Sequence, residues 1–334
     1  MNYRIVLYLL ISVIFISCFD EDKFENTKRG NFEALWNILN ERYCFFEYKD
    51  VDWDEVYTRY SERISGNMDN DAFFSLMAEM LAELKDGHVN LTANHDVARY
   101  WKWYEDYPYN FDTKIQDNYL GTDYGIASGL KYKMLDDNIG YIYYGSFSSG
   151  IGEANINQVL DRFAVCEGII LDIRNNGGGL LSNSEKLASH FFNEKTHVGY
   201  MQHKTGKGRN DFSKPYETYV EPSNGVKYQK KVVILTNRRC YSAANDFVNA
   251  MRYAPDVTIV GDKTGGGSGM PFSSELPNGW SVRFSASPMY DAQMNHLEFG
   301  IDPHYKVDMT DEDMARGIDT IIEKAREIIK SGVS

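Results

Sequence analysis

Short apolar segments alternate with amphipathic ones between residues 139 and 261, and this alternation constrains the fold more than any other feature of the chain. The strands predicted from continuous apolar runs are 139–144, 168–173, 232–236 and 258–261, and the helices predicted from three- and four-residue spacing are 151–163, 184–192 and 243–251. Strands that alternate with helices pair in parallel, because each helix crosses back over the sheet. The pattern therefore predicts an α/β core with a mostly parallel sheet, whose strand carboxyl ends are the expected place for a site.

The first part of the chain has a helical pattern instead. Residues 31–91 contain three apolar stripes at helical spacing, and Asp69 is placed to cap the third helix. We therefore expect a small N-terminal helical bundle over 31–91. Residues 92–138 are rich in aromatic side chains and predict no regular element beyond short strands, so we expect a connecting segment there. The α/β core then occupies 139–334 and ends in one amphipathic helix that Thr310 caps.

The amino terminus resembles an export signal. Arg4 precedes an apolar run over residues 5–16, which is shorter than the roughly 20 residues that span a bilayer. The run ends in Phe15-Ile16-Ser17-Cys18, which resembles a bacterial lipobox, where the cysteine is acylated. We therefore expect a lipoprotein signal peptide over 1–17, lipidation of Cys18 and an acidic tether over 18–30. This implies a lipid anchor in the cell envelope of a Gram-negative-type bacterium; an uncleaved membrane anchor is the alternative.

Charge and composition argue against several kinds of partner. The 334 residues carry a formal net charge of −13, from 35 Lys and Arg against 48 Asp and Glu, so the average surface repels a phosphate backbone. We therefore expect no nucleic-acid partner. The cysteines are widely spaced, without a Cys-x-x-Cys pair, and no two histidines have the His-x-x-x-His spacing. This pattern predicts neither a metal site nor another cofactor.

A predicted strand runs directly into three glycines in the segment 171–179, Leu-Asp-Ile-Arg-Asn-Asn-Gly-Gly-Gly. Glycines let the backbone turn tightly and present bare amide groups, which suits an anion or an oxyanion. A glycine-rich turn without function is the alternative reading. The spacing of a phosphate-binding loop or a dinucleotide fingerprint is missing here.

Three further residues have side chains that could take part in a functional site. Ser242 lies where the strand 232–236 leads into a helix, close to the positive end of the helix dipole; a capping serine is the ordinary reading of that position. His88 follows Asp86-Gly87 at the end of the helical part, where a lone histidine is usually structural. Glu298 precedes a Gly and Pro turn, which otherwise reads as a surface loop.

The order of these segments resembles the family of carboxy-terminal processing and tricorn-core serine peptidases. That family has a D-G-H turn, a strand ending in D-x-R-x-N-x-G-G, a serine in T-x-x-x-x-[FY]-S-A, a G-x-x-T-x-G turn and a late E-x-x-G-[IV]-x-P segment. The matching segments here are 86–88, 172–179, 236–243, 261–266 and 298–303. The resemblance covers about residues 31 to 330 and implies a crotonase-like α/β core behind the helical module.

The resemblance also implies roles for individual residues. Ser242 is the nucleophile, His88 the general base and then acid, and Glu298 the group that orients or supports His88. The backbone amides of Gly178 and Ala243 form the oxyanion hole. One branch of the family uses a lysine as the base, but the matching position is Gly267, which places this chain in the histidine-containing, tricorn-like branch. Lys263 is the fallback base.

The expected function is that of a lipid-anchored serine endopeptidase acting on peptides or unfolded envelope proteins through an acyl-enzyme. Many relatives insert a PDZ domain, but the segment between His88 and Gly140 is too short for one. A non-catalytic protein that binds peptides or apolar ligands on the same scaffold is the alternative, because fold does not determine function. A crotonase-like acyl-thioester enzyme is the third reading. The oligomeric state does not follow from the sequence.

Overall fold

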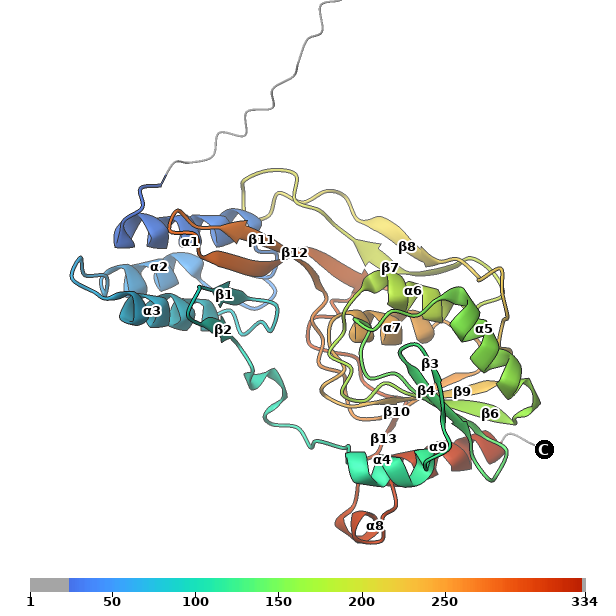
Figure 1. The fold of residues 1–334 in the computed structure, drawn as a ribbon. Helices are drawn as coiled ribbons and strands as arrows, with labels where there is room; N and C mark the ends of the chain where they lie inside the picture. The colour runs from blue at the N-terminus through green and yellow to red at the C-terminus, as the bar shows by residue number, and fades with distance from the viewer. Residues whose placement is uncertain (1–23, 332–334) are drawn as a thin grey trace, which may run out of the picture.

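The computed structural model describes residues 24–331, which form a helical N-terminal module and an α/β core (Figure 1). The predicted signal peptide and Cys18 lie outside the described residues. The helices are α1 (Lys28–Arg42), α2 (Trp53–Ser61), α3 (Asn70–Ala82), η1 (Lys102–Tyr104), α4 (Thr113–Leu120), α5 (Glu153–Arg162), η2 (Phe163–Val165), α6 (Leu181–Ser189), α7 (Ala243–Met251), α8 (Asp311–Ala315) and α9 (Thr320–Lys330). The strands are β1 (Asn90–Thr92), β2 (Val97–Arg99), β3 (Gly125–Ala127), β4 (Leu130–Met134), β5 (Gly140–Tyr143), β6 (Gly168–Asp172), β7 (Thr196–Met201), β8 (Tyr216–Val220), β9 (Lys231–Thr236), β10 (Val257–Gly261), β11 (Gly269–Glu275), β12 (Ser281–Asp291) and β13 (Tyr305–Lys306).

The core is built on a seven-stranded sheet with the order β13-β10-β9-β6-β5-β4-β3. The strands from β13 to β5 are parallel, and the hairpin strands β4 and β3 continue the sheet antiparallel. The predicted α/β class is confirmed, and each apolar run that predicted a core strand forms one. Because β6 and β9 are adjacent parallel strands, their carboxyl ends bring residues 173–179 and 237–242 to the same edge of the sheet.

Helices cover both faces of this sheet, which explains why its strands are apolar at successive positions (Figure 1). Ile169 and Leu171 of β6 pack into one core with α5, α6 and α7, whereas Ile170 between them packs on the other face with α9. Alternate side chains of a strand point to opposite faces, so a strand covered on both faces must be apolar throughout.

The three helices of the N-terminal module appear where their apolar stripes predict them, and Asp69 caps α3 as expected. The hydrophobic core of the N-terminal module also contains residues from much later in the chain. Strand β12 crosses from one part of the molecule to the other: Val282 and Phe284 pack among the helices of the module, while Met289–Asp291 pairs with β7 beside the core. Residues distant in sequence therefore complete the module and join it to the core.

Two segments differ from the sequence-based prediction. The connecting segment contains the helix α4, which Asp112 caps by accepting from the N–H groups of Lys114 and Ile115. The single C-terminal helix expected after Thr310 is two helices, because Gly317 adopts φ +72° after α8 and Asp319 starts α9 with a new cap. Within residues 24–331, no helix has both the length and the apolar character that crossing a membrane requires.

Candidate active site

Ser242 lies at the turn between β9 and α7 with φ 57° and ψ −123°. A residue other than glycine at such a positive φ is strained and persists only where its surroundings hold it. The Ser242 N–H donates to the carbonyl of Gly266 at 2.8 Å, which fixes the turn. The hydroxyl makes no capping hydrogen bond to α7, so the ordinary reading of Ser242 as a helix cap does not apply.

The hydroxyl instead meets the imidazole of His88. His88 Nε2 lies 2.9 Å from Ser242 Oγ, although the two residues are distant in the chain. The turn that carries His88 packs tightly against the loop of Ser242, because a side chain on Gly87 would collide with the Tyr241 hydroxyl at 2.9 Å and with Trp103 at 2.8 Å. The glycine of the D-G-H segment therefore allows the close approach that brings the histidine to the serine.

His88 is buried, and its surroundings favour the neutral imidazole. Burial lowers the pKa of His88 to about 4; Asp86 opposes this shift, while the positive charges of Arg283 and Lys49 add to it. A neutral imidazole with its proton on Nδ1 can accept the proton of the serine hydroxyl at Nε2. At neutral pH, His88 is therefore in the protonation state that a general base needs.

A buried ionic cluster lies behind His88. Asp86 accepts the backbone N–H of His88 at 2.8 Å and also accepts from the hydroxyls of Tyr43 and Ser285. Lys49 Nζ lies 3.6 Å from Asp86 Oδ2 and 2.7 Å from Glu298 Oε1, and the three side chains are at most 4% exposed. Lys49 is thus the shared cation of two buried carboxylates.

Glu298 is in this cluster, but it makes no hydrogen bond to His88 among the described residues. Its Oε2 atom accepts the backbone N–H of Ser268 at 2.9 Å, and its Oε1 atom pairs with Lys49. Burial raises the pKa of Glu298 to about 7, against the opposing charge of Lys49. Glu298 therefore does not orient His88 through a hydrogen bond of its own. Asp86 holds the turn of His88, and Glu298 connects to Asp86 through Lys49, which is an indirect form of the expected support.

The roles of Asp86 and Lys49 were not predicted from the sequence. Asp86 stands in the D-G-H segment, so its motif could have marked it. Lys49 lies in a loop between α1 and α2, and nothing in its neighbourhood in the sequence distinguishes it from a surface lysine. Only packing of the N-terminal module against the core buries it.

The two backbone N–H groups predicted to form the oxyanion hole differ in whether they already have a hydrogen-bond acceptor. Ala243 is the first residue of α7, where an N–H group has no acceptor within the helix. The Gly178 N–H, in contrast, donates to the side-chain oxygen of Asn176 at 3.0 Å. The structure therefore leaves the Ala243 amide facing the site and engages the Gly178 amide elsewhere.

Gly178 nevertheless borders the site closely. Its φ of +93° disfavours any other residue, and a Cβ atom there would lie 2.8 Å from Ser242 Cβ and 2.9 Å from the Ala243 nitrogen. A side chain at this position would thus fill the space in front of the Ala243 amide. The bare glycine keeps that space open for the oxygen of a substrate carbonyl.

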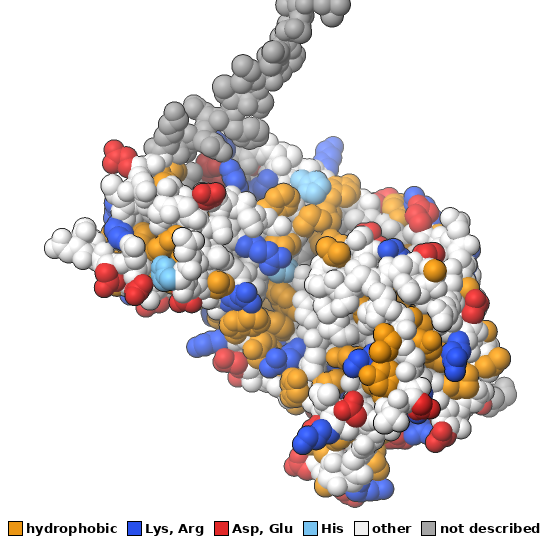
Figure 2. Space-filling view, in the orientation of Figure 1, with side chains coloured by type: hydrophobic (Ala, Val, Ile, Leu, Met, Phe, Trp, Pro, Cys, Tyr) orange, Lys and Arg blue, Asp and Glu red, His pale blue; other side chains and the backbone are white. Residues whose placement is uncertain are grey.

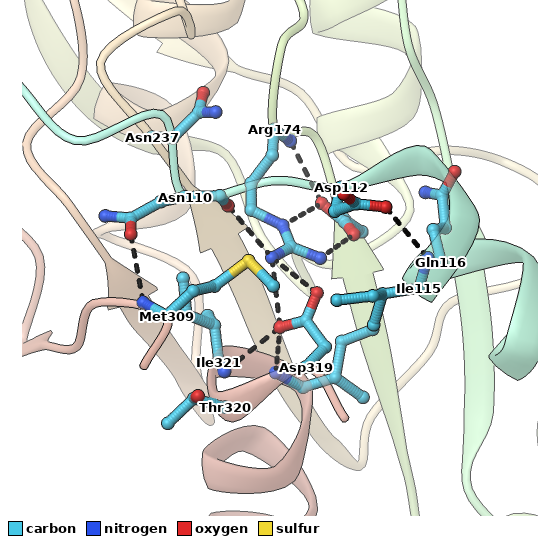
Figure 3. Close-up of polar contacts among 12 residues, drawn as sticks. Asn110, Asp112, Ile115, Gln116, Arg174, Asn237, Met309, Asp319, Thr320 and Ile321 are labelled. Atoms are coloured by element: carbon cyan, nitrogen blue, oxygen red, sulfur yellow. Dashed lines mark hydrogen bonds and ion pairs between the residues drawn. The ribbon is translucent and has the colours of Figure 1, made fainter. Parts of the chain in front are cut away.

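Arg174, in the D-x-R segment that leads into the same loop, has a structural role, and Figure 3 shows its contacts. The Arg174 guanidinium is fully buried and pairs with Asp172 at 2.6 Å and with Asp319 at 2.9 Å, and it also donates to the carbonyl of Asn110 at 3.2 Å. These contacts tie the end of β6 to the connecting segment and to the start of α9. They fix the backbone that leads from β6 into the glycine loop.

The structure does not bring the fallback base to the serine. Lys263 Nζ lies 3.6 Å from Asp302 and has no contact with Ser242 among the described residues. Gly267 stands where relatives of the other branch have their lysine, and a Cβ there would lie 2.4 Å from the ring of Tyr241. The packing of Tyr241 therefore excludes a lysine at that position.

A cavity of about 230 Å³ opens beside the pair and is bordered by Ser242, His88, Ala243 and Gly179 together with apolar side chains from α6 and β12. Figure 2 shows hydrophobic and basic side chains side by side where the N-terminal module meets the core. The Ser242 hydroxyl is hydrogen-bonded to a buried neutral imidazole, and it lies next to the N-terminal amide of α7 and to an open cavity. This arrangement defines the class of the site as that of a serine-type hydrolase.

Comparison with known proteins gives the family. Residues 138–307 match the sequence model of peptidase family S41, and residues 24–82 match that of the tricorn protease C1 domain. The chain belongs to peptidase family S41, the family of the serine-type carboxy-terminal processing proteases, as the sequence resemblance indicated.

Individual relatives agree with this assignment. The carboxy-terminal processing proteases CtpA and CtpB of Bacillus subtilis (strain 168) are 25% and 22% identical over 54% of this chain, and the matches span only 37% and 36% of their own lengths. A solved structure of a candidate peptidase from Parabacteroides merdae ATCC 43184 is 56% identical, with a TM-score of 0.88 over 91% of this chain and 97% of that one. Mature CPAF, at 12% identity, shares the fold with a TM-score of 0.68 over 91% of this chain and 96% of its own.

Proposed function

We propose that this protein is an active serine endopeptidase that hydrolyses peptide bonds of peptides or partly unfolded proteins through an acyl-enzyme. The observation that carries the proposal is the 2.9 Å contact between His88 Nε2 and Ser242 Oγ. Ser242 Oγ attacks the scissile carbonyl carbon while His88 takes the hydroxyl proton. His88 then gives that proton to the leaving amine, and water attacks the acyl-enzyme in a second round of the same chemistry.

The oxyanion of the tetrahedral intermediate lies in front of Ala243, in the space that Gly178 leaves open. The Ala243 N–H supplies one hydrogen bond, and the Gly178 N–H supplies a second when it exchanges Asn176 for the oxyanion. One such donor is worth about 3 to 4 kcal/mol of transition-state stabilisation. We also assign the core to the crotonase-like class, on the basis of the sequence resemblance and of a parallel sheet covered by helices on both faces.

The experiment that tests this proposal compares wild-type protein with S242A on casein and on synthetic peptides. Wild-type protein should release fragments and react covalently with a fluorophosphonate at Ser242, and S242A should do neither. Equal turnover by both proteins would exclude Ser242 as the nucleophile. A folded wild-type sample that neither cleaves nor labels, beside a reference serine peptidase that labels, would favour the non-catalytic binding protein.

We further propose that the chain is lipid-anchored through Cys18 in the cell envelope and meets its substrates there. The lipobox-like Phe15-Ile16-Ser17-Cys18 and the acidic residues after it support this proposal. Radiolabelled palmitate should enter the wild-type protein and not C18A, and detergent should be needed to release only the former from membranes. Label in both variants, or in neither, would contradict the anchor.

A further inference from the structure

The cavity beside Ser242 has apolar walls. Leu180, Leu181, Met289 and Leu297 line it, and its volume of about 230 Å³ exceeds the roughly 150 Å³ of a cavity that holds a benzene ring. It is therefore large enough for a long substrate side chain, and it lies next to the serine that would hold the substrate carbonyl.

One acidic residue, Asp246, borders this cavity. Asp246 follows Ser242 by one turn of α7, and its N–H donates to the Ser242 carbonyl at 3.0 Å. Residues four apart lie on the same face of a helix, and four residues rise about 6 Å along its axis, so Asp246 stands about one turn behind Ser242 on the side that borders the cavity. Its Oδ2 atom has a long contact of 3.4 Å with the Ser184 hydroxyl.

The described part of the protein supplies no cation to this carboxylate. No lysine, arginine or histidine of residues 24–331 forms an ion pair with Asp246; the one ionised group that acts on it is Glu185, whose charge is of the same sign. Burial and Glu185 raise the pKa of Asp246 to about 7. Arg283 borders the same cavity without pairing with Asp246. A half-buried carboxylate without a counter-charge is unfavourable, and a cation that enters the cavity would relieve it.

We propose that Asp246 determines specificity by binding the ammonium or guanidinium group of a lysine or arginine that precedes the scissile bond. This inference rests on the proposed peptidase function. The leucines and methionine of the walls contact the methylene groups of such a side chain, and the carboxylate pairs with its charged end. A purely apolar side chain would cover Asp246 and leave it unpaired, so it is the poorer substrate.

Cleavage of matched peptides tests the preference. The peptides differ only in the residue before the cut, which is lysine, arginine or norleucine, the last having the four-carbon chain of lysine without its ammonium group. For wild-type protein we expect kcat/KM for lysine to exceed that for norleucine about tenfold, as one charge-assisted contact provides, and the ratio to fall to about one in D246N. E185Q, which changes an acid that does not line the cavity, should keep the preference. A wild-type ratio near one, or an unchanged ratio in D246N, would overturn the inference.

A binding measurement separates this inference from the proposed activity. Benzamidine is a small amidinium probe that should raise the Tm of S242A and leave the Tm of the double variant S242A/D246N unchanged, because a ligand stabilises only the folded state that binds it. Absence of a shift in S242A would exclude the cation pocket whether or not peptides are cleaved. Absence of cleavage together with a shift that needs Asp246 would contradict the peptidase and leave the cation pocket supported.

Discussion

Lys49 Nζ lies 2.7 Å from Glu298 Oε1, and this pair connects a loop of the N-terminal module to the last motif of the core. The same ammonium group lies 3.6 Å from Asp86, whose carboxylate holds the backbone of His88. Two carboxylates and one cation therefore meet in a buried place behind the proposed base. The position of His88 depends on this cluster, because Asp86 and Glu298 would repel each other without Lys49.

K49M should destabilise the protein. Removing the cation leaves two buried carboxylates unpaired, which costs about 3 to 5 kcal/mol of unfolding free energy. Urea unfolding at pH 7 measures the change. K324M is the matched control, because Lys324 forms an exposed pair with Glu327, whose loss costs at most about 1 kcal/mol. Equal free energies of unfolding for K49M and K324M would show that the ion pairs of Lys49 with Asp86 and Glu298 do not stabilise the protein.

The pH profile should report the burial of His88. Its pKa is lowered to about 4, so the imidazole stays neutral and able to accept a proton until the pH falls near that value. We expect kcat/KM to decrease with a midpoint near pH 4 in the acid range. An exposed histidine would give a midpoint near 6.5. Profiles between pH 3.5 and 8 on a peptide substrate, with circular dichroism to monitor folding, decide between the two values.

The free energy of unfolding should also depend on the protonation of His88. Because the pKa of His88 is lower in the folded protein than in the unfolded chain, the unfolded chain binds more protons between about pH 6.5 and 4. His88 therefore lowers stability as the pH falls through this window. H88Q should show a weaker loss of stability than wild type over that window in urea titrations. Parallel curves for the two proteins would contradict the lowered pKa.

G178A should impair catalysis more than G177A does. A Cβ atom on Gly178 would lie 2.9 Å from the Ala243 nitrogen, where the oxyanion is expected, and it would stand at a φ of +93°. We expect kcat to fall about 10² to 10³-fold, the usual cost of an oxyanion donor. A Cβ on Gly177 meets nothing within 4 Å, which makes G177A the control. Similar kcat values for the two folded variants would remove Gly178 from the site.

H88A and K263A should separate the two candidate bases. His88 contacts Ser242, whereas Lys263 faces Asp302. Loss of the histidine should reduce kcat by about 10⁴ to 10⁶-fold, as in other serine peptidases that lose a member of the catalytic set. K263A should remain within about twofold of wild type, the scale of a surface change. The reverse pattern in a peptide assay would make Lys263 the base.

The sequence by itself determined the elements of the core and the chemistry of the pair. The apolar runs of β6 and β9 and the amphipathic α7 depend on neighbouring residues, so their periodicity is readable. The sequence motifs also led to Ser242 and His88, which the fold brings to 2.9 Å. The last helix was less readable, since Gly317 divides it through a local backbone conformation that hydrophobic spacing does not reveal.

Only the tertiary structure determined which charged residues lie near Ser242 and His88. Lys49 resembles a surface lysine until the N-terminal module packs against the core, and Glu298 meets that lysine instead of His88. Likewise, the engagement of the Gly178 N–H by Asn176 and the place of Asp246 at an apolar cavity follow from how separate segments pack. Local patterns determine helices and strands, but burial and pairing of charges depend on contacts between residues far apart in the chain, which no local pattern contains.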